Sequence, residues 1–553
     1  MALSMEIDQL RQYLDHPQEA GRWLGAWKLD DVDRAHAALL RMAVAGIPLD
    51  LLANMCEQLA EQLPRLSDPD MALNNLDRFV ATVRNPLSIA TLFERDREGL
   101  PILLQIFSTS QYLSDLLVTD SEAYDLLRMT EGQPVARNVL IDELCSEVAA
   151  LNDEKGVMTA LRRFKRRETL RIAYGDIIRG QRLEIVTAQI SYLADAIVEA
   201  AYRFARASLE RKRGVPRGPD RQRCRFAVLA MGKLGGGELN YSSDIDLIFL
   251  YEAEGATDGQ RSLANVEFFD RLARDIIKLL TELTPLGAAY RVDLRLRPEG
   301  QHGPTVPNLE SALHYYDVSG RTWERQAFLK ARAAAGDADF GQEFLNRLEP
   351  WVYRRYLSRA DIAGIKALKR RIEHHVKTEG ADLRNVKTGH GGIRDIEFTI
   401  QFLQLLSGGD LPELRTGNTL EAIALLEGGG CLTGQERGIL EENYAFLRKT
   451  EHRLQLMFDL QTHLLPTSNQ ELRRLAIRMG YSDTPDKPAL DAFTADYKQR
   501  TVLNRKILDH LLHDAFGEED KPEPEVDLVL DPDPQPEHIS GVLGRYPFHD
   551  SQL

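Results

Sequence analysis

The chain has 553 residues, of which 43% are hydrophobic and 28% are charged, and it carries a net charge of −15. These values are typical of a globular protein with roughly three to four domains, and they disfavour nucleic-acid binding, which needs a basic surface. Four scattered cysteines, no 18-residue apolar stretch and no signal-like N-terminus argue against a disulfide framework, membrane spanning and secretion, so we expect a cytoplasmic protein.

The first part of the chain, residues 1–210, is predicted to be an N-terminal helical domain. Apolar residues recur with helical spacing through this region, and residues 183–209 form its longest such stretch. We interpret Trp23 and Trp27 as packing residues. The following segment, 211–225, carries seven basic residues and is interpreted as a solvated linker, with attraction of phosphate or a partner as the alternative.

Residues 211–335 are predicted to form an α/β module. An apolar strand over 226–231 leads into a glycine-rich turn, GKLGGG, and the sequence Ser-Asp-x-Asp then begins a second apolar strand. Because side chains two apart on a strand point the same way, Asp244 and Asp246 present both carboxylates to one side, with Cα atoms roughly 7 Å apart. Paired carboxylates beside a glycine turn suit Mg²⁺ and a phosphate group.

A third acidic residue, Asp293, lies in YRVDLRLRP (residues 290–298), which we predict to be another short alternating strand. Residues 262–283 between the strands favour an amphipathic helix with Val266, Phe269 and Leu272 on its buried stripe. If Asp293 pairs beside the other two, three carboxylates can hold a pair of divalent cations for transfer at phosphorus. The pattern is neither a Walker loop nor a dinucleotide-binding fingerprint.

Residues 336–516 are predicted to form a C-terminal helical bundle, with long periodic stretches at 361–378 and 435–461. The glycine-rich segment 387–398 leads into a helix whose polar residues could reach the site, although capping of the helix start is the favoured interpretation; these residues are Arg394, Asp395 and Glu397. The histidines of this region are interpreted as surface or capping residues; they are His374, His375 and His390. Residues 517–553 are acidic and rich in proline, so we expect a linker followed by the start of a missing region.

Several stretches together resemble one protein family. Residues 226–251 resemble the nucleotidyltransferase superfamily that includes DNA polymerase β, and the chain from about 60 to 515 resembles the bifunctional glutamine synthetase adenylyltransferase/adenylyl-removing enzymes. The further stretches are DPDMALNNL (68–76), ALRRFKRRE (160–168), GRTWER (320–325), KAR (330–332), VYRRY (352–356) and GGIRDIEF (391–398). The resemblance implies an α+β fold, mostly α-helical, in which a small polymerase β-like sheet module is flanked by helical domains.

Two stretches favour the N-terminal, adenylyl-removing unit of that family: ELNYSSD at 238–244 and GRTWER. The resemblance then implies deadenylylation of glutamine synthetase, in which phosphate attacks adenylyl-tyrosine and releases ADP. It also implies glutamine synthetase in its adenylylated form, phosphate, ADP or ATP and a PII signal protein as partners. Two alternatives stay open: adenylylation of glutamine synthetase with ATP by the same carboxylates, and a non-catalytic regulatory docking module.

The site residues follow from this chemistry. We expect Asp244 and Asp246 to hold Mg²⁺ or Mn²⁺, and Asp293 to coordinate metal or act electrostatically nearby. Donors that would surround the phosphates are Gly232, Gly235, Gly236 and Ser243, with Lys233 adding charge. Arg295 and Arg297, expected on the same side as Asp293, could bind the incoming phosphate, and a structural ion pair is an equal alternative. Gly232-Lys233 stands where the wider superfamily has Gly-Ser, a departure shared with the adenylyltransferase family.

Overall fold

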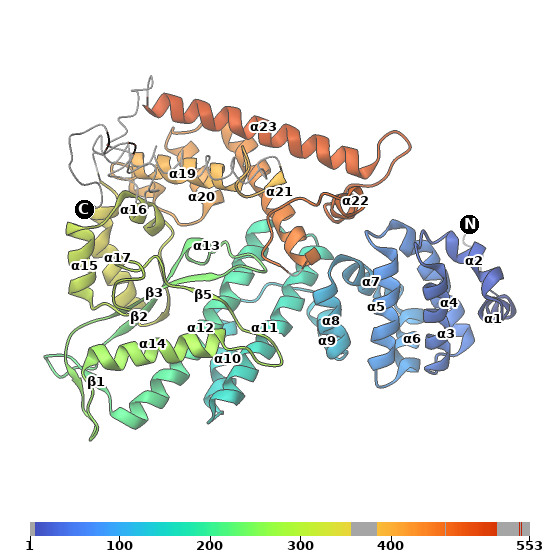
Figure 1. Cartoon of the computed structure of the whole chain (residues 1–553), viewed down its shortest axis with the longest axis horizontal. Coiled ribbons are helices and arrows are strands. Elements are labelled where there is room, and N and C mark those ends of the chain that lie inside the picture. The colour runs from blue at the N-terminus through green and yellow to red at the C-terminus, as the bar shows by residue number, and fades with distance from the viewer. Residues whose placement is uncertain (1–5, 355–383, 459, 517–540, 542–543, 545–553) are drawn as a thin grey trace. The chain divides into compact units, whose positions relative to one another are not determined.

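The structure is a computed structural model that describes residues 6–354, 384–458 and 460–516, together with 541 and 544 (Figure 1). The helix predicted over 361–378, with His374 and His375, lies outside the described residues, as does nearly all of the predicted tail 517–553. Most described residues are helical and the main sheet has four strands, which confirms the predicted α+β, mostly helical fold. None of the described helices is both long and apolar enough to cross a bilayer.

The chain divides into two compact units. Unit 1 comprises Met1–Val135, Phe164–Ile190 and Arg448–Lys498, and unit 2 comprises Ala136–Arg163, Ser191–Leu447 and Gln499–Leu553. Each unit is made of stretches that are separated in sequence. The sequence predicts consecutive domains instead, and the boundaries of those domains stay a prediction. Four long helices carry residues of both units: α11 (Glu154–Ile177), α12 (Leu183–Arg213), α21 (Gly434–Phe458) and α23 (Ala489–Phe516).

Unit 1 is built of short helices with well-defined starts. The side chains of Asp68 and Asn85 accept backbone N–H groups of the first turn, and a proline follows each of them at the first helical position. Trp27 is buried and Trp23 stacks on Tyr13, so both act in packing as predicted. The helices are α1 (Ile7–Asp15), α2 (Pro17–Gly25), α3 (Val32–Val44), α4 (Leu49–Gln62), η1 (Leu63–Arg65), α5 (Pro69–Thr82), α6 (Pro86–Arg95), α7 (Gly99–Thr109), α8 (Gln111–Thr119), α9 (Ala123–Thr130) and α22 (Asn469–Arg478).

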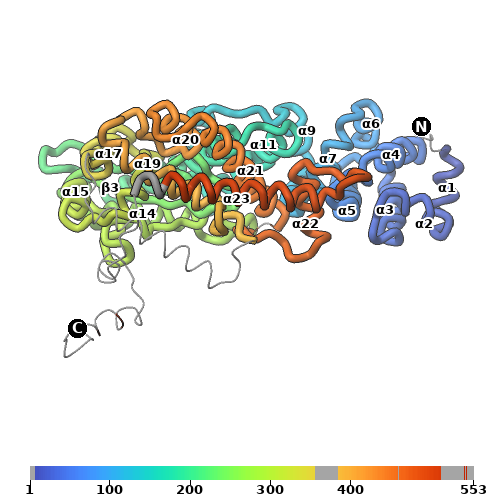
Figure 2. Tube along the Cα trace, turned by 90° about the horizontal axis from the view of Figure 1, so that it is seen from above, coloured from blue at the N-terminus to red at the C-terminus, as the bar shows by residue number. Residues whose placement is uncertain are grey.

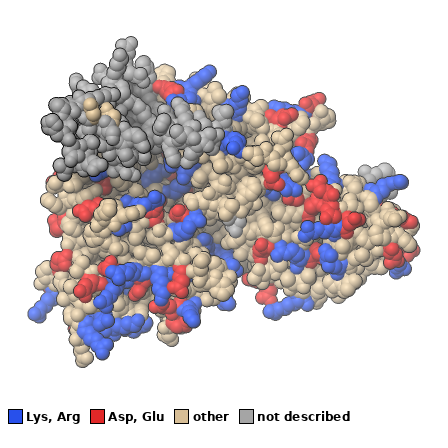
Figure 3. Space-filling view, in the orientation of Figure 1, with Lys and Arg blue, Asp and Glu red and all other residues tan. Residues whose placement is uncertain are grey.

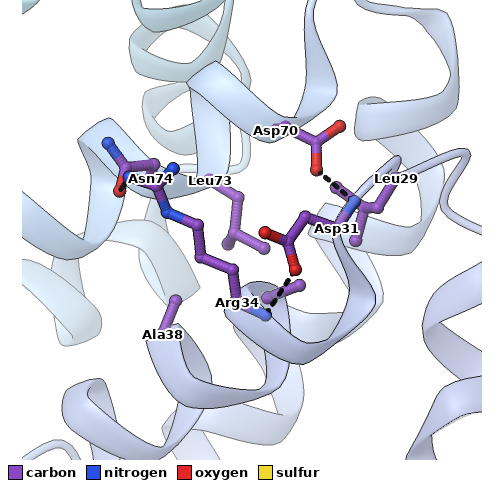
Figure 4. Close-up of a pocket in the computed structure, with 8 residues that line it drawn as sticks. Leu29, Asp31, Arg34, Ala38, Asp70, Leu73 and Asn74 are labelled. Carbon is purple, nitrogen blue, oxygen red and sulfur yellow. Dashed lines mark hydrogen bonds between the residues drawn. The ribbon is translucent and has the colours of Figure 1, made fainter.

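One carboxylate of α5 fixes the start of α3. Asp70 accepts the backbone N–H groups of Asp30 and Asp31 at 2.9 and 3.0 Å, and Asp31 in turn caps α3 by accepting the N–H of Arg34 (Figure 4). The Arg34 guanidinium donates to Asn74 at 2.7 Å. These contacts enclose a space of about 10 Å³, which holds one water molecule at most and leaves no room for a ligand.

Unit 1 also buries charged side chains. Arg453 of α21 forms two parallel hydrogen bonds with the carboxylate of Asp176, each 2.7 Å long, and both residues are less than a tenth exposed. Arg478 donates to Ser67 Oγ and to the carbonyl of Ser108. Bidentate pairing of this kind offsets the cost of removing the charges from water, and loss of either partner would leave a buried charge.

Unit 2 contains a four-stranded sheet in the order β5–β3–β2–β6. β2 (Phe226–Met231) pairs antiparallel with β3 (Ile245–Tyr251) and with β6 (Arg332–Gly336), and β3 pairs parallel with β5 (Val292–Asp293). β2 and β3 are almost wholly buried because helices cover both faces of the sheet. Their sequences are therefore nearly continuous runs of apolar residues. A separate two-stranded ribbon is formed by β1 (Pro216–Arg217) and β4 (Ala256–Thr257).

Alternate residues of β2 face different helices. Phe226 stacks on Phe269 of α14 (Asn265–Thr281) and on Tyr202 of α12, whereas Ala227 and Leu229 lie against Gly341 of α17 (Ala338–Val352). The helix predicted over 262–283 is therefore confirmed as α14. Phe269 and Leu272 of the predicted stripe are buried, as is Phe268, whereas Val266 is 45% exposed, so its place on that stripe was predicted wrongly.

Further helices of unit 2 extend from the sheet. In Figures 1 and 2 the C-terminal part of α23 lies beside α19, and Asn504 of α23 donates to the carbonyl of Gly391, which precedes α19. The predicted helix at 435–461 corresponds to α21. The remaining helices are α10 (Arg137–Ala149), α13 (Gly232–Gly235), α15 (Leu309–Val318), α16 (Thr322–Phe328), α19 (Ile393–Ser407), η3 (Pro412–Leu414) and α20 (Thr419–Gly428).

The basic segment 211–225 is more ordered than the predicted solvated linker. Its first three residues complete α12, and β1 follows them. Arg217 pairs with Asp258, and Arg223 pairs with Glu210. Figure 3 shows basic and acidic side chains interspersed on the face drawn there. Three of the seven basic residues of this segment, Arg217, Arg223 and Arg225, are therefore paired with neighbouring carboxylates.

His452 of α21 provides a test of the packing of unit 1. The side chain is 2% exposed, and burial lowers its pKa to about 3, whereas an unfolded histidine has a pKa of about 6.5. The unfolded chain therefore binds the proton first, so the stabilisation is complete above pH 6.5 and declines as the pH falls from 6.5 towards 3. Lowering the pH from 7.5 to 5 should cost about 2 kcal/mol through this group.

The measurement is urea-dependent hydrogen exchange of α21 peptides at both pH values. His452→Gln removes the titrating group and should flatten the pH dependence, whereas His314→Gln, at an exposed position, should leave it unchanged. Equal pH dependence in the wild-type chain and His452→Gln would contradict this account.

Candidate active site

The pairing of β3 with β5 brings together the acidic residues singled out from the sequence. In the parallel register, Asp246 of β3 lies directly opposite Asp293 of β5, so both side chains point to the same face of the sheet. Asp244 precedes β3 by one residue and stands two positions before Asp246. The register thus brings Asp246 and Asp293 together, with Asp244 two residues before Asp246, and a shared metal site for the three carboxylates stays a prediction. We call Asp244, Asp246 and Asp293 the acidic trio.

The three carboxylates have different surroundings. Burial, together with the negative charges of Asp293 and Asp244, raises the pKa of Asp246 to about 6. Among the described residues, Asp246 has no hydrogen-bond or ion-pair partner for its carboxylate. Asp244 is paired with Arg291, and Asp293 accepts the Nε–H of Arg295 at 2.8 Å, which lowers the pKa of Asp293.

The donor set of the trio suits a divalent cation, because three aspartates on one sheet face offer hard oxygen ligands. The backbone leaves room beside them: a Cβ at Gly232 would lie 2.5 Å from Asp246 Oδ2. In the parts of the chain that the structure describes, no three His, Cys, Asp or Glu side chains are grouped as ready metal ligands. Asp244 and Asp293 are instead paired with Arg291 and Arg295.

The glycine turn forms the short helix α13 beside Asp246. Gly232 has φ +56°, a conformation that favours glycine, and it starts the turn next to the carboxylate. Gly235 and Gly236 pack against backbone: a Cβ at Gly235 would lie 1.9 Å from the Lys330 carbonyl oxygen, and one at Gly236 would lie 2.6 Å from that of Gly417. The N–H of Gly236 donates to the carbonyl of Gly232 within the turn. Close packing therefore explains the glycines at 235 and 236.

Two other predicted phosphate-binding residues flank the trio. Ser243, directly before Asp244, accepts the backbone N–H of Asn240 with its Oγ at 3.3 Å, and it is partly exposed. Lys233 lies in the first turn of α13 and is also partly exposed. Ser243 is thus adjacent to Asp244 in the chain and Lys233 follows Gly232, the glycine beside Asp246; their binding of phosphate stays a prediction.

The strand predicted over 290–298 was wrong in its length. β5 contains only Val292 and Asp293, and the chain then turns, because Asp293 Oδ1 accepts the backbone N–H of Arg295 at 2.8 Å. Arg295 forms an ion pair with Asp293, one of the two predicted alternatives. Arg297 donates to the carbonyls of Leu294, Pro304 and Gly303 and so braces the following loop.

A buried charged cluster behind the glycine turn was not predicted. Lys330 donates to Glu238 at 2.6 Å, and both side chains are less than a tenth exposed. Glu238 also accepts the N–H of Thr419 at 2.6 Å, at the start of α20, where a negative charge is favourable. Lys330 lies 3.8 Å from Glu397 of α19. The sequence feature that could have indicated this cluster is Lys330 itself, because it is a charged residue between the buried Phe328 and β6.

The glycine-rich segment before α19 acts mainly as a cap, as favoured from the sequence. Asp395 accepts the N–H of Gly391 at 2.8 Å, and Glu397 accepts a hydrogen bond from the hydroxyl of Tyr444. Asp395 and Glu397 are therefore engaged within the helical part of unit 2. His390 is partly buried in the same segment.

Comparisons with known proteins match most of the chain. Residues 100–347 match the family model described as glutamate-ammonia ligase adenylyltransferase, and residues 366–512 match the model described as GlnD PII-uridylyltransferase. The first range contains the trio, the glycine turn and Lys330.

Three relatives are each named bifunctional glutamine synthetase adenylyltransferase/adenylyl-removing enzyme. The Bradyrhizobium sp. (strain BTAi1) protein is 40% identical over 76% of this chain and 43% of its own length. The Hahella chejuensis protein is 37% identical over 69% and 40%, and the Thioalkalivibrio sulfidiphilus protein is 39% identical over 65% and 37%. The chain thus spans less than half the length of the curated relatives it matches.

The packing of the glycine turn gives a stability prediction. Gly235→Ala should destabilise unit 2 by about 1–3 kcal/mol, because the new methyl group would meet the carbonyl oxygens of Lys330 and Ala230. Gly428→Ala is the matched control, since a Cβ there meets nothing within 4 Å. Differential scanning calorimetry of both variants checks the prediction. Equal transition temperatures for the two variants would contradict the close packing of the turn against the carbonyl oxygens of Lys330 and Ala230.

Proposed function

Residues 100–347 belong to the glutamate-ammonia ligase adenylyltransferase family, as the sequence resemblance predicted, and we propose that the acidic trio removes AMP from an adenylylated tyrosine of glutamine synthetase. Orthophosphate is the attacking group and ADP is the product. The sequence ELNYSSD at 238–244 supports removal rather than attachment, because it resembles the removing unit of the family. The cytoplasm, where four free cysteines would stay reduced, is the proposed location.

The observation that carries this proposal is the parallel register between β3 and β5. It sets Asp293 opposite Asp246, with Asp244 two residues before Asp246 in the chain and the glycine turn beside Asp246. A trio of aspartates at strand ends beside a tight glycine turn supports transfer of a phosphoryl group, because such transfer depends on positioning and charge neutralisation.

The reaction itself makes small demands on acid–base groups. An oxygen of the phosphate dianion forms a bond to the AMP phosphorus while the bond from that phosphorus to the tyrosine oxygen breaks. The phenolate leaves readily because its conjugate acid has a pKa of about 10, and it then takes a proton from water. Lys233, Ser243 and the N-terminal turn of α13 would orient the phosphates, so the chain mainly binds and aligns the two reactants.

Mg²⁺ or Mn²⁺ is the proposed cofactor, and it would be held by Asp244, Asp246 and Asp293. When bound, such a cation neutralises the charge that develops on the phosphoryl oxygens. Asp246 is ready for this role, since it has no other partner among the described residues. Asp244 and Asp293 would first have to release Arg291 and Arg295.

A second partner is proposed from the C-terminal match. Residues 366–512 resemble a PII-uridylyltransferase, which supports contact between this part of the chain and a PII signal protein.

Substitution of the trio tests the activity. Asp246→Asn and Asp244→Asn should each lower phosphate-dependent ADP formation from adenylylated glutamine synthetase by about 10³-fold or more, because each removes a charge that holds the cofactor. ADP is measured by chromatography. Asp270→Asn is the matched control: Asp270 pairs with Arg274 on the surface of α14 and should keep full activity.

The same assay decides the direction of the reaction. Incubation of unmodified glutamine synthetase with ATP should yield no adenylylated product. Adenylylation without ADP formation from the modified enzyme would replace the proposal with the attaching reaction. Full activity in Asp246→Asn would remove the trio from the mechanism.

Metal binding is tested separately from turnover. Asp246→Asn should weaken Mn²⁺ binding about 10–100-fold, the range for loss of a group that supports a metal site. Arg291→Met should instead tighten it, because the substitution frees Asp244 from its ion pair. Electron paramagnetic resonance of Mn²⁺ measures both affinities. Weaker binding in Arg291→Met would show that Arg291 supports the site rather than competing for Asp244.

A further inference from the structure

The last turn of α14 holds the segment of chain that leads into β5. The final carbonyl groups of an α-helix have no partner within the helix, so their hydrogen bonds come from donors elsewhere. In α14, the carbonyl of Leu280 accepts the N–H groups of Ala289 and Tyr290 at 2.9 and 3.1 Å. The end of this helix therefore fixes the chain just before Asp293.

A buried guanidinium supplies further donors at the same helix end. Arg162 of α11 is 1% exposed, and it belongs to unit 2 together with α14 and β5. Its Nη1 and Nη2 donate to the carbonyls of Leu279 and Glu282 at 3.0 and 2.5 Å, and its Nε donates to that of Gly287 at 2.8 Å. A positive charge at the C-terminal end of a helix is favourable. Arg162 thus caps α14 and also holds the turn that follows the helix.

The turn after α14 passes this constraint on to β5. Thr284 and Gly287 exchange backbone hydrogen bonds of 3.1 and 2.8 Å, and the Thr284 hydroxyl donates to the same Gly287 carbonyl at 3.0 Å. Beyond the turn, the carbonyl of Arg291 accepts the N–H of Ile245 at 3.0 Å, where β5 begins to pair with β3. Arg162 is therefore connected to the strand pairing through a short segment that is hydrogen-bonded at both ends.

Arg162 is bound by carbonyl groups rather than by a carboxylate. Within the described residues it forms no ion pair. Burial lowers the pKa of its guanidinium, and the nearby negative charge of Glu282 opposes this effect only in part. Removing a charge from water without a paired counterion is costly. Its forked donors nevertheless fix three carbonyls in one geometry, which matters because β5 contributes only two residues to the sheet.

We propose that Arg162 is a positioning residue, which fixes the end of α14 and the following turn and thereby holds β5 in the register that places Asp293 opposite Asp246. Arg162 acts through Asp293 and makes no contact with substrate or metal in this proposal. The inference rests on the proposed function for the part that Asp293 plays in metal binding and turnover.

The first test is Arg162→Met, followed by hydrogen exchange without metal or substrate. The substitution keeps an aliphatic side chain and removes the donors. Exchange should therefore become about tenfold faster or more at the amides of Ile245, Ala289 and Tyr290, the factor expected when local opening loses a hydrogen bond to a charged group. Amides in the pairing of β2 with β6 should keep the wild-type rate. Arg163→Met is the matched control, since Arg163 is the next residue and is exposed.

Local exchange distinguishes positioning from general stabilisation. Wild-type rates at these amides in Arg162→Met would overturn the inference. Equal acceleration throughout unit 2 would also overturn it, because a purely structural residue has that effect. Faster exchange confined to the end of α14 and the β3–β5 pairing supports it.

The second test shows whether Arg162 acts through Asp293. The affinity for Mn²⁺, measured by electron paramagnetic resonance, should fall about tenfold in Arg162→Met, within the range for loss of a group that supports a metal site. In an Asp293→Asn background the same substitution should change the affinity less than about twofold, because the carboxylate that Arg162 positions is already absent. An equal loss in both backgrounds would overturn the inference.

Turnover should show the same origin. At saturating Mn²⁺, kcat for ADP formation should fall about tenfold or more in Arg162→Met, since a small displacement of a site residue is costly. The KM for phosphate should change less than about twofold, because the proposed phosphate ligands lie on α13 and before β3 rather than on β5. A rise in this KM with unchanged kcat would overturn the inference.

The outcomes separate this inference from the proposed function. A wild-type chain that forms no ADP from adenylylated glutamine synthetase would overturn the function, and the exchange rates would still decide whether Arg162 holds β5. Normal ADP formation together with wild-type exchange in Arg162→Met would overturn the inference alone. If Arg162→Met fails to fold, Arg162→Gln decides, since its shorter side chain cannot reach all three carbonyls: faster exchange confined to the same amides supports the inference, and wild-type exchange overturns it.

Discussion

The site depends on one short pairing, in which two residues of β5 align parallel with the start of β3. Without it, Asp293 would belong to a loop and the sheet would carry only two neighbouring carboxylates. The pairing places three negative charges on one face, and the repulsion between them raises the pKa of Asp246 together with burial. Such an arrangement persists only because the surrounding strands and helices hold it in place.

Backbone packing is what fixes the glycine turn against this face. Gly235 and Gly236 allow carbonyl groups of residues distant in sequence, Lys330 and Gly417, to approach within contact distance of the turn. The buried pair of Lys330 and Glu238 then connects the turn to α20 through Thr419. A displacement of the helical part of unit 2 would therefore be transmitted to the turn, because the contacts are rigid and leave no space for independent movement.

The local parts of the site could be predicted from the sequence, and the long-range parts could not. The pattern of apolar and polar residues, together with the turn residues, identified β2, the glycine turn, the Asp244–Asp246 pair and α14. The length of β5 was predicted wrongly because the Asp293 side chain accepts the backbone N–H of Arg295, which turns the chain out of the strand. The alternation of apolar and polar residues does not indicate this effect. The pairing of Lys330 with Glu238 joins residues 92 positions apart, and the hydrogen bond from Asn418 to the Gly236 carbonyl joins residues 182 positions apart. No local pattern encodes such contacts.

The charges around the trio balance one another without any ligand. Asp244 and Asp293 are paired with Arg291 and Arg295, and the charge of Lys387 lowers the pKa of Asp246 against the larger effects of burial and of the other two carboxylates. These two ion pairs lower the electrostatic cost of holding three carboxylates close together. If Asp244 and Asp293 hold the proposed divalent cation, Arg291 and Arg295 would be free to donate to phosphate oxygens. The same arginines would then serve first as internal counterions and afterwards as phosphate ligands, which links metal binding to substrate binding in one exchange of partners.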